Sequence, residues 1–305
     1  MKGIFYILIS TTCFALVNLC VKILAGSDSV FELETQDYSP FQIVFFRSII
    51  SLSICIAIIK AKGIPFFGNN KKWLIVRGVF GATALTLFFY TIKNLPLAIA
   101  TTVQYLSPVF TVIFAIFLVN EKVKPIQWLY FAISFAGVVL IGFTKGDVDT
   151  AAIDPFWVIM GVVSALGSGI AYNAIMKCRL TDAPITIVMY FPLISTPITL
   201  IISLANGFVI PQGAEWILIL IIGIFTQIAQ IYMTKALHAE KASIVTPFKY
   251  FGAIYAIFIG SFVFFEDLVP MLYLGILLII SGVLLNSIGK IMDSLKRRNT
   301  QKTIS

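Results

Sequence analysis

Ten long apolar stretches alternate with short polar connections along the chain. Each stretch is about 18–23 residues long, which is the length that a helix needs to cross roughly 30 Å of hydrocarbon. The stretches cover residues 4–25, 41–59, 73–92, 97–119, 126–143, 156–176, 185–205, 215–235, 243–264 and 270–289. Their continuous apolar character argues against a β-barrel, whose strands alternate and span only about 10 residues. The pattern predicts an all-α integral membrane protein with ten transmembrane helices.

The second half of the chain repeats the first. Thr101, Tyr105, Glu121, Pro125 and Gly137 fall on Thr246, Tyr250, Glu266, Pro270 and Gly282 when the halves are aligned. Each half holds five spans, and an odd number of crossings turns the second half upside down. Inverted repeats with a substrate site at their interface are typical of secondary transporters. We therefore expect two five-helix inverted repeats, at residues 1–145 and 154–290, followed by a basic cytoplasmic tail at 291–305.

Composition agrees with a membrane protein. Of the 305 residues, 59% are hydrophobic and 12% are charged, and the mean hydropathy is +0.98, so the chain is more apolar than a soluble domain. The first stretch is too long for a signal peptide and lacks a small-residue cleavage site, so we expect it to be retained. A lone His238 and the absence of a Cys/His cluster exclude an ordinary zinc site, and no cofactor is expected.

The basic residues predict the orientation of the spans. If the N-terminus is cytoplasmic, most of the 22 Lys and Arg residues fall in cytoplasmic connections or in the tail, Arg77 among them. The external connections then hold Lys93 and Lys145 together with most of the acidic residues. We expect both termini inside and the 26–39 loop outside. The net charge of +8 follows from this bias, so membrane lipid rather than nucleic acid is the expected surrounding.

Three basic residues remain within the spans: Lys22, Arg47 and Lys249. No carboxylate lies at comparable depth in the sequence. Ionisable groups inside a membrane are expensive and usually face a cavity or mark a pathway, so we infer that a substrate supplies the missing anion. Lys22 is expected to snorkel to the nearer interface, and snorkelling is also an alternative for Arg47.

The fourth and ninth spans carry equivalent polar faces. Thr101, Gln104 and Tyr105 share one helical face, as do Thr246, Lys249 and Tyr250. As repeat equivalents, the two faces should meet at mid-depth, with Gln104 opposite Lys249 breaking the symmetry. For the Thr and Gln side chains, hydrogen bonding between packed helices is the alternative. The candidate substrate-binding residues are Lys249, Tyr250, Gln104, Tyr105, Thr101, Thr246, Asn18, Asn173, Tyr90, Gln230 and Arg47.

Prolines interrupt three of the expected spans. Pro108 lies in the fourth, Pro192 and Pro197 lie in the seventh, and Pro247 lies in the ninth. A proline inside a helix removes a backbone hydrogen bond, so these positions predict kinks or gating hinges.

Two segments carry a family resemblance. The first runs from Arg77-Gly78 through Lys93-Asn94-Leu95-Pro96 and Gln104-Tyr105 to Asn120-Glu121-Lys122, and the second runs from Ala242 through Thr246-Pro247-Phe248-Lys249-Tyr250 to Phe265-Glu266-Asp267. Together they resemble the drug/metabolite transporter superfamily, EamA type, over nearly the whole chain. The resemblance implies a five-plus-five inverted fold, a central cavity and alternating access. The superfamily handles amino acids, nucleosides, nucleotide sugars, phosphorylated sugars and S-adenosylmethionine. The compact chain most resembles bacterial inner-membrane members.

The sequence therefore predicts a secondary transporter, not an enzyme, for a small polar metabolite bearing a carboxylate or a phosphate. Lys249 is expected to bind that group, and an amino acid or an S-adenosylmethionine-like compound is favoured over the alternative of nucleotide-sugar or sugar-phosphate exchange. A channel suits an asymmetric cavity less well. A membrane-embedded enzyme would need an HExxH motif, paired intramembrane carboxylates or an activated nucleophile, and the sequence has none. The oligomeric state stays open, a homodimer included.

Overall fold

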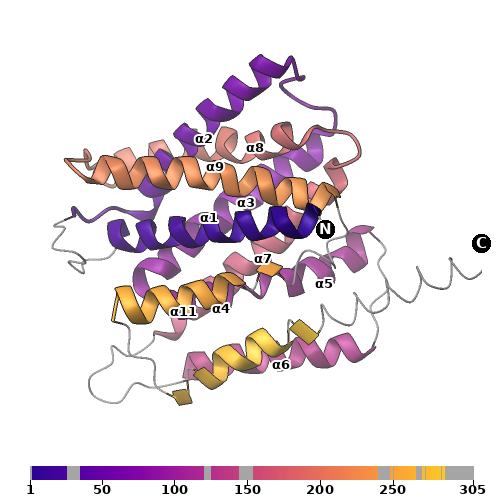
Figure 1. Cartoon of the computed structure of the whole chain (residues 1–305), viewed down its shortest axis with the longest axis vertical. Coiled ribbons are helices and arrows are strands. Elements are labelled where there is room, and N and C mark those ends of the chain that lie inside the picture. The colour runs from indigo at the N-terminus through magenta and orange to yellow at the C-terminus, as the bar shows by residue number, and fades with distance from the viewer. Residues whose placement is uncertain are drawn as a thin grey trace, which may run out of the picture.

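A computed structural model describes residues 2–25, 35–119, 125–143, 154–239, 248–249, 251–265, 270–271, 273–282 and 284–285. This part of the chain is helical and contains no strand. The helices are α1 (Lys2–Ala25), α2 (Pro40–Lys62), α3 (Lys71–Asn94), α4 (Leu97–Gln104), α5 (Ser107–Val119), α6 (Pro125–Phe143), α7 (Pro155–Cys178), α8 (Pro184–Ala205), α9 (Glu215–Ala239) and α11 (Phe251–Val263) (Figure 1).

Among the described residues, 7 helices are long and apolar enough to cross a membrane, with α4 and α5 together forming the one at Leu97–Leu118. Shorter apolar helices at Trp128–Gly137, Ile254–Val263 and Tyr273–Gly282 fall within the other three expected spans. The structure therefore supports a multi-pass helical membrane protein, while the count of ten spans stays a prediction.

Large apolar side chains cover the outside of the bundle at helical spacing. On α7, Ile159, Val163 and Leu166 are exposed, and a similar stripe runs along α9. A soluble protein rarely exposes continuous apolar patches of this kind. These faces are suited to contact with lipid chains.

Capping residues explain where several helices begin and end. Ser39 accepts a hydrogen bond from the first turn of α2, and Pro40 occupies its first position, where no backbone donor is needed. Asp154 and Pro155 start α7 in the same way. α2 ends at Gly63, whose φ of 61° is in the left-handed region that glycine adopts without a steric cost.

The expected span at 97–119 is interrupted. α4 ends at Gln104, and α5 begins at Ser107. Pro108 has no backbone N–H, so it cannot bond the Gln104 carbonyl four residues earlier, and the helix breaks there. The prediction of an interruption at Pro108 is confirmed, whereas α8 continues through Pro192 and Pro197. The break places Gln104 and Tyr105 at a helix end in the interior of the bundle.

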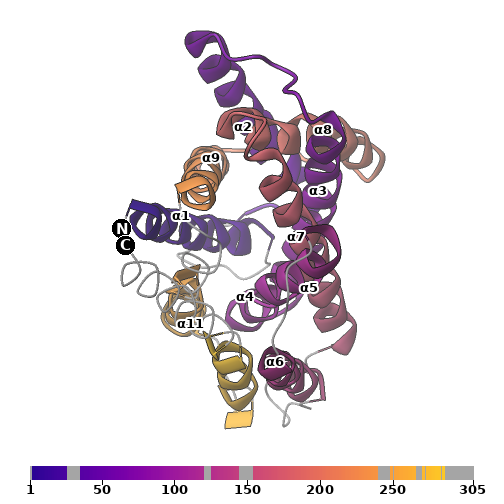
Figure 2. The same ribbon diagram turned by 90° about the vertical axis from the view of Figure 1, so that its right-hand side faces the viewer.

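Helices from the two halves of the chain pair with each other. α1 packs along α9, α3 along α7, α2 along α8, and α4 against α11; α9 lies beside α1 in both views (Figures 1 and 2). Tyr6 contacts Tyr232 with ring centroids 5.5 Å apart, and the Ser10 hydroxyl donates to the Ala229 carbonyl. Residue numbers rise along α1 as they fall along α9, so these two helices are antiparallel.

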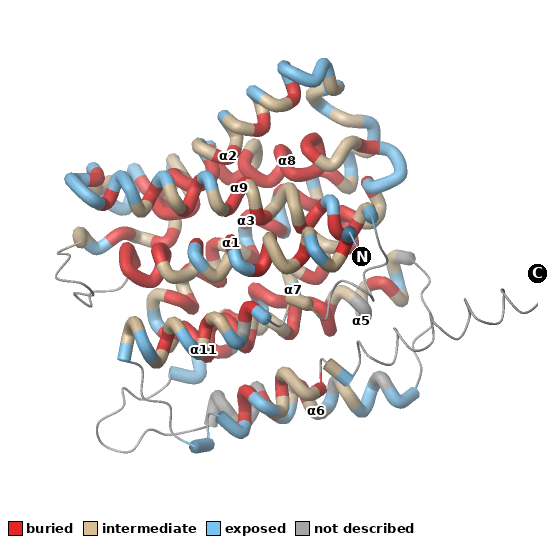
Figure 3. Tube along the Cα trace, in the orientation of Figure 1, coloured by how far each residue is buried: buried red, intermediate tan, exposed pale blue. Residues whose placement is uncertain are grey.

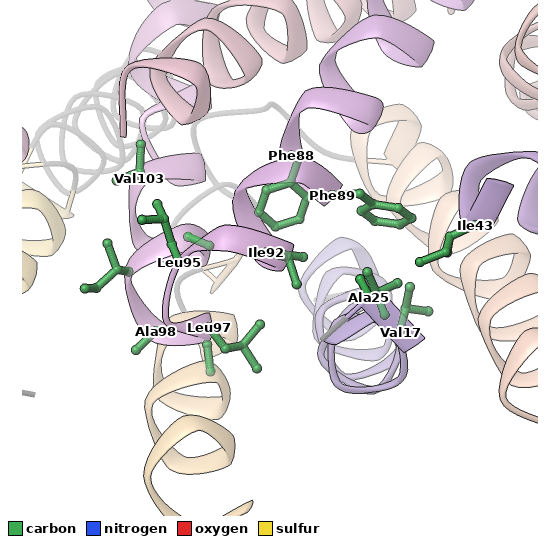
Figure 4. Close-up of a cluster of buried hydrophobic side chains, with 14 of the residues drawn as sticks. Val17, Ala25, Ile43, Phe88, Phe89, Ile92, Leu95, Leu97, Ala98 and Val103 are labelled. Carbon is green, nitrogen blue, oxygen red and sulfur yellow. The ribbon is translucent and has the colours of Figure 1, made fainter. Parts of the chain in front are cut away.

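Two apolar clusters hold the bundle together. Figure 4 shows part of the larger one, in which Val17, Ile43, Phe89 and Leu97 are packed together from α1, α2, α3 and α4. The second cluster contains Ile7, Leu74, Ile175, Met189 and Met233. Figure 3 shows buried segments running through the interior helices, while the end of α2 at the top of the view is exposed.

Candidate functional site

A cavity of ≈ 150 Å³ lies among the middle turns of the helices. Both apolar clusters contribute to its wall, since Val17 and Phe89 line it from one and Ile7 and Met233 from the other. Seven of the candidate residues also line it: Asn18, Arg47, Thr101, Gln104, Tyr105, Gln230 and Lys249. Residues far apart in the sequence are thus brought to one site.

The α4 face has both of the roles that the sequence left open. Gln104 donates from Nε2 to the Ser168 hydroxyl and accepts from the Ser164 hydroxyl, both at 2.9 Å. These bonds join α4 to α7, yet Gln104 and Ser168 also line the cavity. Thr101 donates to the Leu97 carbonyl of its own helix at 2.8 Å. The Gln104 amide is therefore held in a fixed orientation at the cavity wall.

α11 brings its side of the site against α4. The Tyr105 hydroxyl lies so close to Gly252 that a Cβ at that position would overlap it. Just before α11, the Lys249 ammonium lies 3.9 Å from the centre of the Tyr172 ring, which is a cation–π contact with α7. Tyr172 and Lys249 both line the cavity.

Arg47 is buried inside the bundle and does not reach an interface. Its side chain is 1% exposed, and Nε donates to the Thr226 hydroxyl at 2.9 Å. The guanidinium carbon lies 5.0 Å from the centre of the Phe191 ring, but Nη1 has no hydrogen-bond partner. The snorkelling alternative is wrong for Arg47 because the side chain faces the cavity.

Arg77 is the functional candidate that the sequence analysis missed. The sequence predicts a cytoplasmic position for Arg77, but its side chain is 4% exposed and lines the cavity. Nη2 donates to Gln230 at 3.1 Å, the guanidinium carbon lies 5.5 Å from the Phe191 ring centre, and Nε has no partner. Gly81 makes this position possible, since a Cβ there would overlap Nη1. The glycine one helical turn after the arginine was the available signal.

Two candidates lie elsewhere in the bundle. Asn173 is buried and donates to the Thr111 and Gly169 carbonyls at 2.9 Å, which ties α7 to α5. Tyr90 stacks on Trp157 with an interplanar angle of 7°. Neither side chain lines the cavity: the Asn173 amide nitrogen joins α7 to α5, Oδ1 of Asn173 is buried without a partner, and Tyr90 joins α3 to α7. Thr246 and Tyr250 fall outside the described residues.

Two further polar residues pack between helices instead of facing the cavity. Lys22 does not snorkel: it is 9% exposed and donates to the Ile92 and Leu95 carbonyls at the end of α3, where a cation is favourable. Gln227 accepts from the Ser51 hydroxyl and donates to the Cys55 sulfur, which joins α9 to α2.

The charge of the cavity is positive. Arg47, Arg77 and Lys249 line it, and within the described part of the chain no Asp or Glu side chain does. No group of three or more His, Cys, Asp or Glu residues that could hold a metal ion occurs among the described residues. The arrangement can bind an anion, and the hydroxyl and amide groups of Gln104, Tyr105 and Gln230 are placed to orient a polar molecule.

Comparison with known proteins identifies the family to which the chain belongs. A model of the EamA-like transporter family matches residues 1–143 and 155–288. The chain is similar to the pseudopaline exporter CntI of Pseudomonas aeruginosa, with 26% identity over 257 residues that cover 83% of this chain and 84% of the exporter. It is also similar to human solute carrier family 35 member G1, with 30% identity over 278 residues, 87% of this chain and 73% of the carrier.

A solved structure matches the fold. One crystal structure with 20% sequence identity to this chain superposes on it with a TM-score of 0.62, covering 93% of this chain and 95% of its own. At this level of identity the likeness concerns the fold alone.

Proposed function

Because this chain belongs to the EamA-like transporter family of the drug/metabolite transporter superfamily, we propose that it is a secondary transporter for a small polar metabolite bearing a carboxylate or a phosphate. Relatives that cover most of its length are a named exporter and a named solute carrier. The observation that carries the choice of substrate class is the charge of the cavity, where three cations lie without a carboxylate among the described lining residues.

Lys249 is the proposed anchor of the anionic group. An ammonium on a flexible stem is a compact donor that can follow a substrate, and Lys249 lines the cavity beside Tyr172. Gln104 and Tyr105 would orient the rest of the molecule, with Tyr250 and Thr246 completing the α11 side. An amino acid or an S-adenosylmethionine-like compound would bind through its carboxylate.

Alternating access between two inverted five-helix repeats is the proposed mechanism. The pairing of helices supports it: a two-fold axis in the membrane plane would turn the α1–α9 pair into the α3–α7 pair and would map the α2–α8 and α4–α11 pairs onto themselves, and these are the pairs that pack. The two matched ranges of the family model agree with halves at 1–145 and 154–290.

The proposed location is a bacterial inner membrane, with both termini in the cytoplasm. Hydrogen bonds link the connections expected inside, since the Asp182 carboxylate accepts from the Asn69 and Asn70 backbone. At the opposite end, Glu215 accepts from Tyr38 of the loop expected outside. Cysteine labelling that placed residue 300 outside would overturn this topology.

We also propose that transport is not driven by protons through a buried carboxylate, since such relays use an intramembrane Asp, Glu or His. Exchange, or flow down the gradient of the substrate, would then supply the energy. Strong uphill accumulation in proteoliposomes under a pH gradient, with the membrane potential clamped, would contradict this.

Binding and uptake test the proposed function. Amino acids, nucleotides, sulfonium compounds and sugar phosphates are screened by thermal shift, because a ligand of the folded state raises its melting temperature by mass action. The best anion is then radiolabelled for uptake.

We expect Lys249→Gln to abolish uptake while melting temperature and elution profile stay unchanged. Lys235→Gln is the matched control, because Lys235 also lies over an aromatic ring, that of Tyr232, but is exposed outside the cavity. Full uptake by Lys249→Gln would contradict the proposal that Lys249 binds the anionic group of the substrate.

A further inference from the structure

Arg47 and Arg77 share one aromatic ring deep in the bundle. Their guanidinium carbons lie 5.0 and 5.5 Å from the centre of the Phe191 ring. The three residues come from α2, α3 and α8, so the arrangement depends on the assembled fold. Two like charges that contact the same ring repel each other, and a medium of low dielectric constant screens this repulsion less than water does.

The protein groups around the two arginines do not satisfy them. Thr226 and Gln230 each accept one hydrogen bond, but Nη1 of Arg47 and Nε of Arg77 are buried and have no partner. A cation–π contact with Phe191 offsets only part of the cost of removing two guanidinium groups from water. Both side chains also line the cavity, so an anion bound there would lie next to the two guanidinium groups.

Resting on the function proposed above, we infer that Arg47 of α2 and Arg77 of α3 form a second anion-binding site in the cavity, in addition to Lys249, and that the substrate carries two anionic groups. Lys249 binds one carboxylate, and the arginine pair binds a second carboxylate or a phosphate. Guanidinium groups present several donors in fixed directions and match the oxygens of these anions. Within the class proposed above, small polar metabolites bearing a carboxylate or a phosphate, this inference narrows the choice to dicarboxylates, acidic amino acids among them, and phosphorylated carboxylates, in place of compounds with a single carboxylate.

Gly81 supplies a way to disturb this site without removing a charge. A Cβ at Gly81 would overlap Nη1 of Arg77 and would lie 3.0 Å from the Phe191 ring. The overlapping atom is the far end of a flexible side chain, so Gly81→Ala displaces the guanidinium and leaves the backbone able to fold. Arg77→Gln removes the charge instead, and Arg179→Gln is the control at an exposed arginine of the same chain.

The experiment compares diacids with matched monoacids by calorimetric titration of the purified full chain at constant ionic strength. The pairs are succinate with succinamate, glutarate with glutaramate, and 3-phosphoglycerate with glycerate. We expect at least one diacid to bind about 10- to 100-fold more tightly than its partner, which is the usual range for charge-assisted hydrogen bonds. Arg77→Gln and Gly81→Ala should bring this ratio close to one, and Arg179→Gln should leave it unchanged.

Equal affinities within every pair, including no binding at all, would overturn the second site. So would a ratio that survives both Arg77→Gln and Gly81→Ala. Lys249→Gln separates this inference from the proposed function, because it should weaken both members of a pair equally. If uptake survives Lys249→Gln but the ratio still depends on Arg77, the Lys249 anchor fails and the arginine site stands.

Discussion

Glu215, where α9 begins, and the arginine pair in the cavity are all buried charges, but their surroundings differ. The Glu215 carboxylate is 4% exposed and accepts hydrogen bonds from the Gln36 backbone at 2.6 Å, the Gln36 side chain at 2.8 Å, the Tyr38 hydroxyl at 2.6 Å and the Gln212 backbone at 2.7 Å. It also lies at the N-terminus of a helix, where a negative charge is favourable. Arg47 and Arg77 each keep a buried N–H group without an acceptor.

If the inference above is right, this difference separates a charge with a structural role from charges that bind a ligand. A saturated carboxylate joins the 35–39 segment to the start of α9, and nothing is left for a substrate to bind. Arg47 and Arg77 each have an N–H group without an acceptor, and both side chains line a cavity. Neutralising the Glu215 carboxylate should therefore lower stability, whereas neutralising an arginine should leave stability unchanged or raise it, and the predictions below test that contrast.

The largest change in stability is expected for Glu215→Ala. Removing the carboxylate leaves the buried Tyr38 hydroxyl and the half-buried Gln36 donors unpaired, which should lower the free energy of unfolding by about 2–4 kcal/mol. Thermal melting in detergent measures the loss. Asp37→Ala is the control at the same end of the bundle, because the Asp37 side chain is 70% exposed and forms only a surface ion pair with Lys93; such pairs contribute about 0–1 kcal/mol. Equal losses of stability in the two variants would contradict the structural role of Glu215.

For Arg77→Met we do not expect a loss of stability. Methionine keeps much of the apolar stem against Phe191 and removes a charge that is only partly satisfied. Replacing a buried ion pair by apolar groups is often neutral or stabilising by about 1–4 kcal/mol, and the hydrogen-bond partner that Arg77→Met leaves behind, Gln230, is uncharged. The melting temperature should stay constant or rise while uptake is lost. A drop as large as that of Glu215→Ala would mean that Arg77 is a structural residue.

The sequence predicts the helices and part of the cavity lining, but not every residue of the candidate site. Apolar length, proline and the capping residues predict where helices such as α2 and α7 begin. The equivalent faces around Thr101 and Lys249 pointed to lining residues of the cavity, because helical spacing is visible in a sequence. Arg77 is not recognisable in the sequence, because its position near the start of the helix does not give the direction of the side chain. Only the approach of α8 and the absence of a Cβ at Gly81 turn it inward. Asn173 bonds backbone carbonyls and Tyr90 stacks on a ring. No sequence pattern shows whether such a side chain contacts another helix or lines a cavity.

A smaller effect, with a pH dependence, is expected for Tyr38→Phe. Burial, together with the Glu215 carboxylate that accepts its hydrogen bond, raises the pKa of Tyr38 above the usual value. A raised tyrosine pKa gives stability that is fully present below the ordinary pKa near 10 and is lost as the pH rises through the folded-state value. Tyr38→Phe should cost about 1 kcal/mol at neutral pH.

Melting curves between neutral and alkaline pH measure both parts of this prediction. Because the phenylalanine side chain of the variant has no proton to lose, the difference between wild type and variant should narrow as the pH rises above the ordinary tyrosine value. A gap that stays constant or widens with pH would contradict the coupling of Tyr38 to Glu215.

The smallest effects on stability are expected from two glutamines of α9 that lie three positions apart. Gln227 bonds Ser51 and Cys55 of α2, whereas Gln230 accepts from Arg77 and lines the cavity. Hydrogen bonds between membrane helices contribute about 0.6 kcal/mol on average, so Gln227→Met should shift the melting temperature slightly and leave uptake unchanged. Gln230→Met should shift it as little, since its own bond is of the same kind. Uptake, however, should fall with Gln230→Met, because Arg77 loses the acceptor that positions its guanidinium. Measuring melting and uptake on both variants separates packing from substrate binding within one helix. Equal uptake by the two variants would show that Gln230, like Gln227, only joins helices.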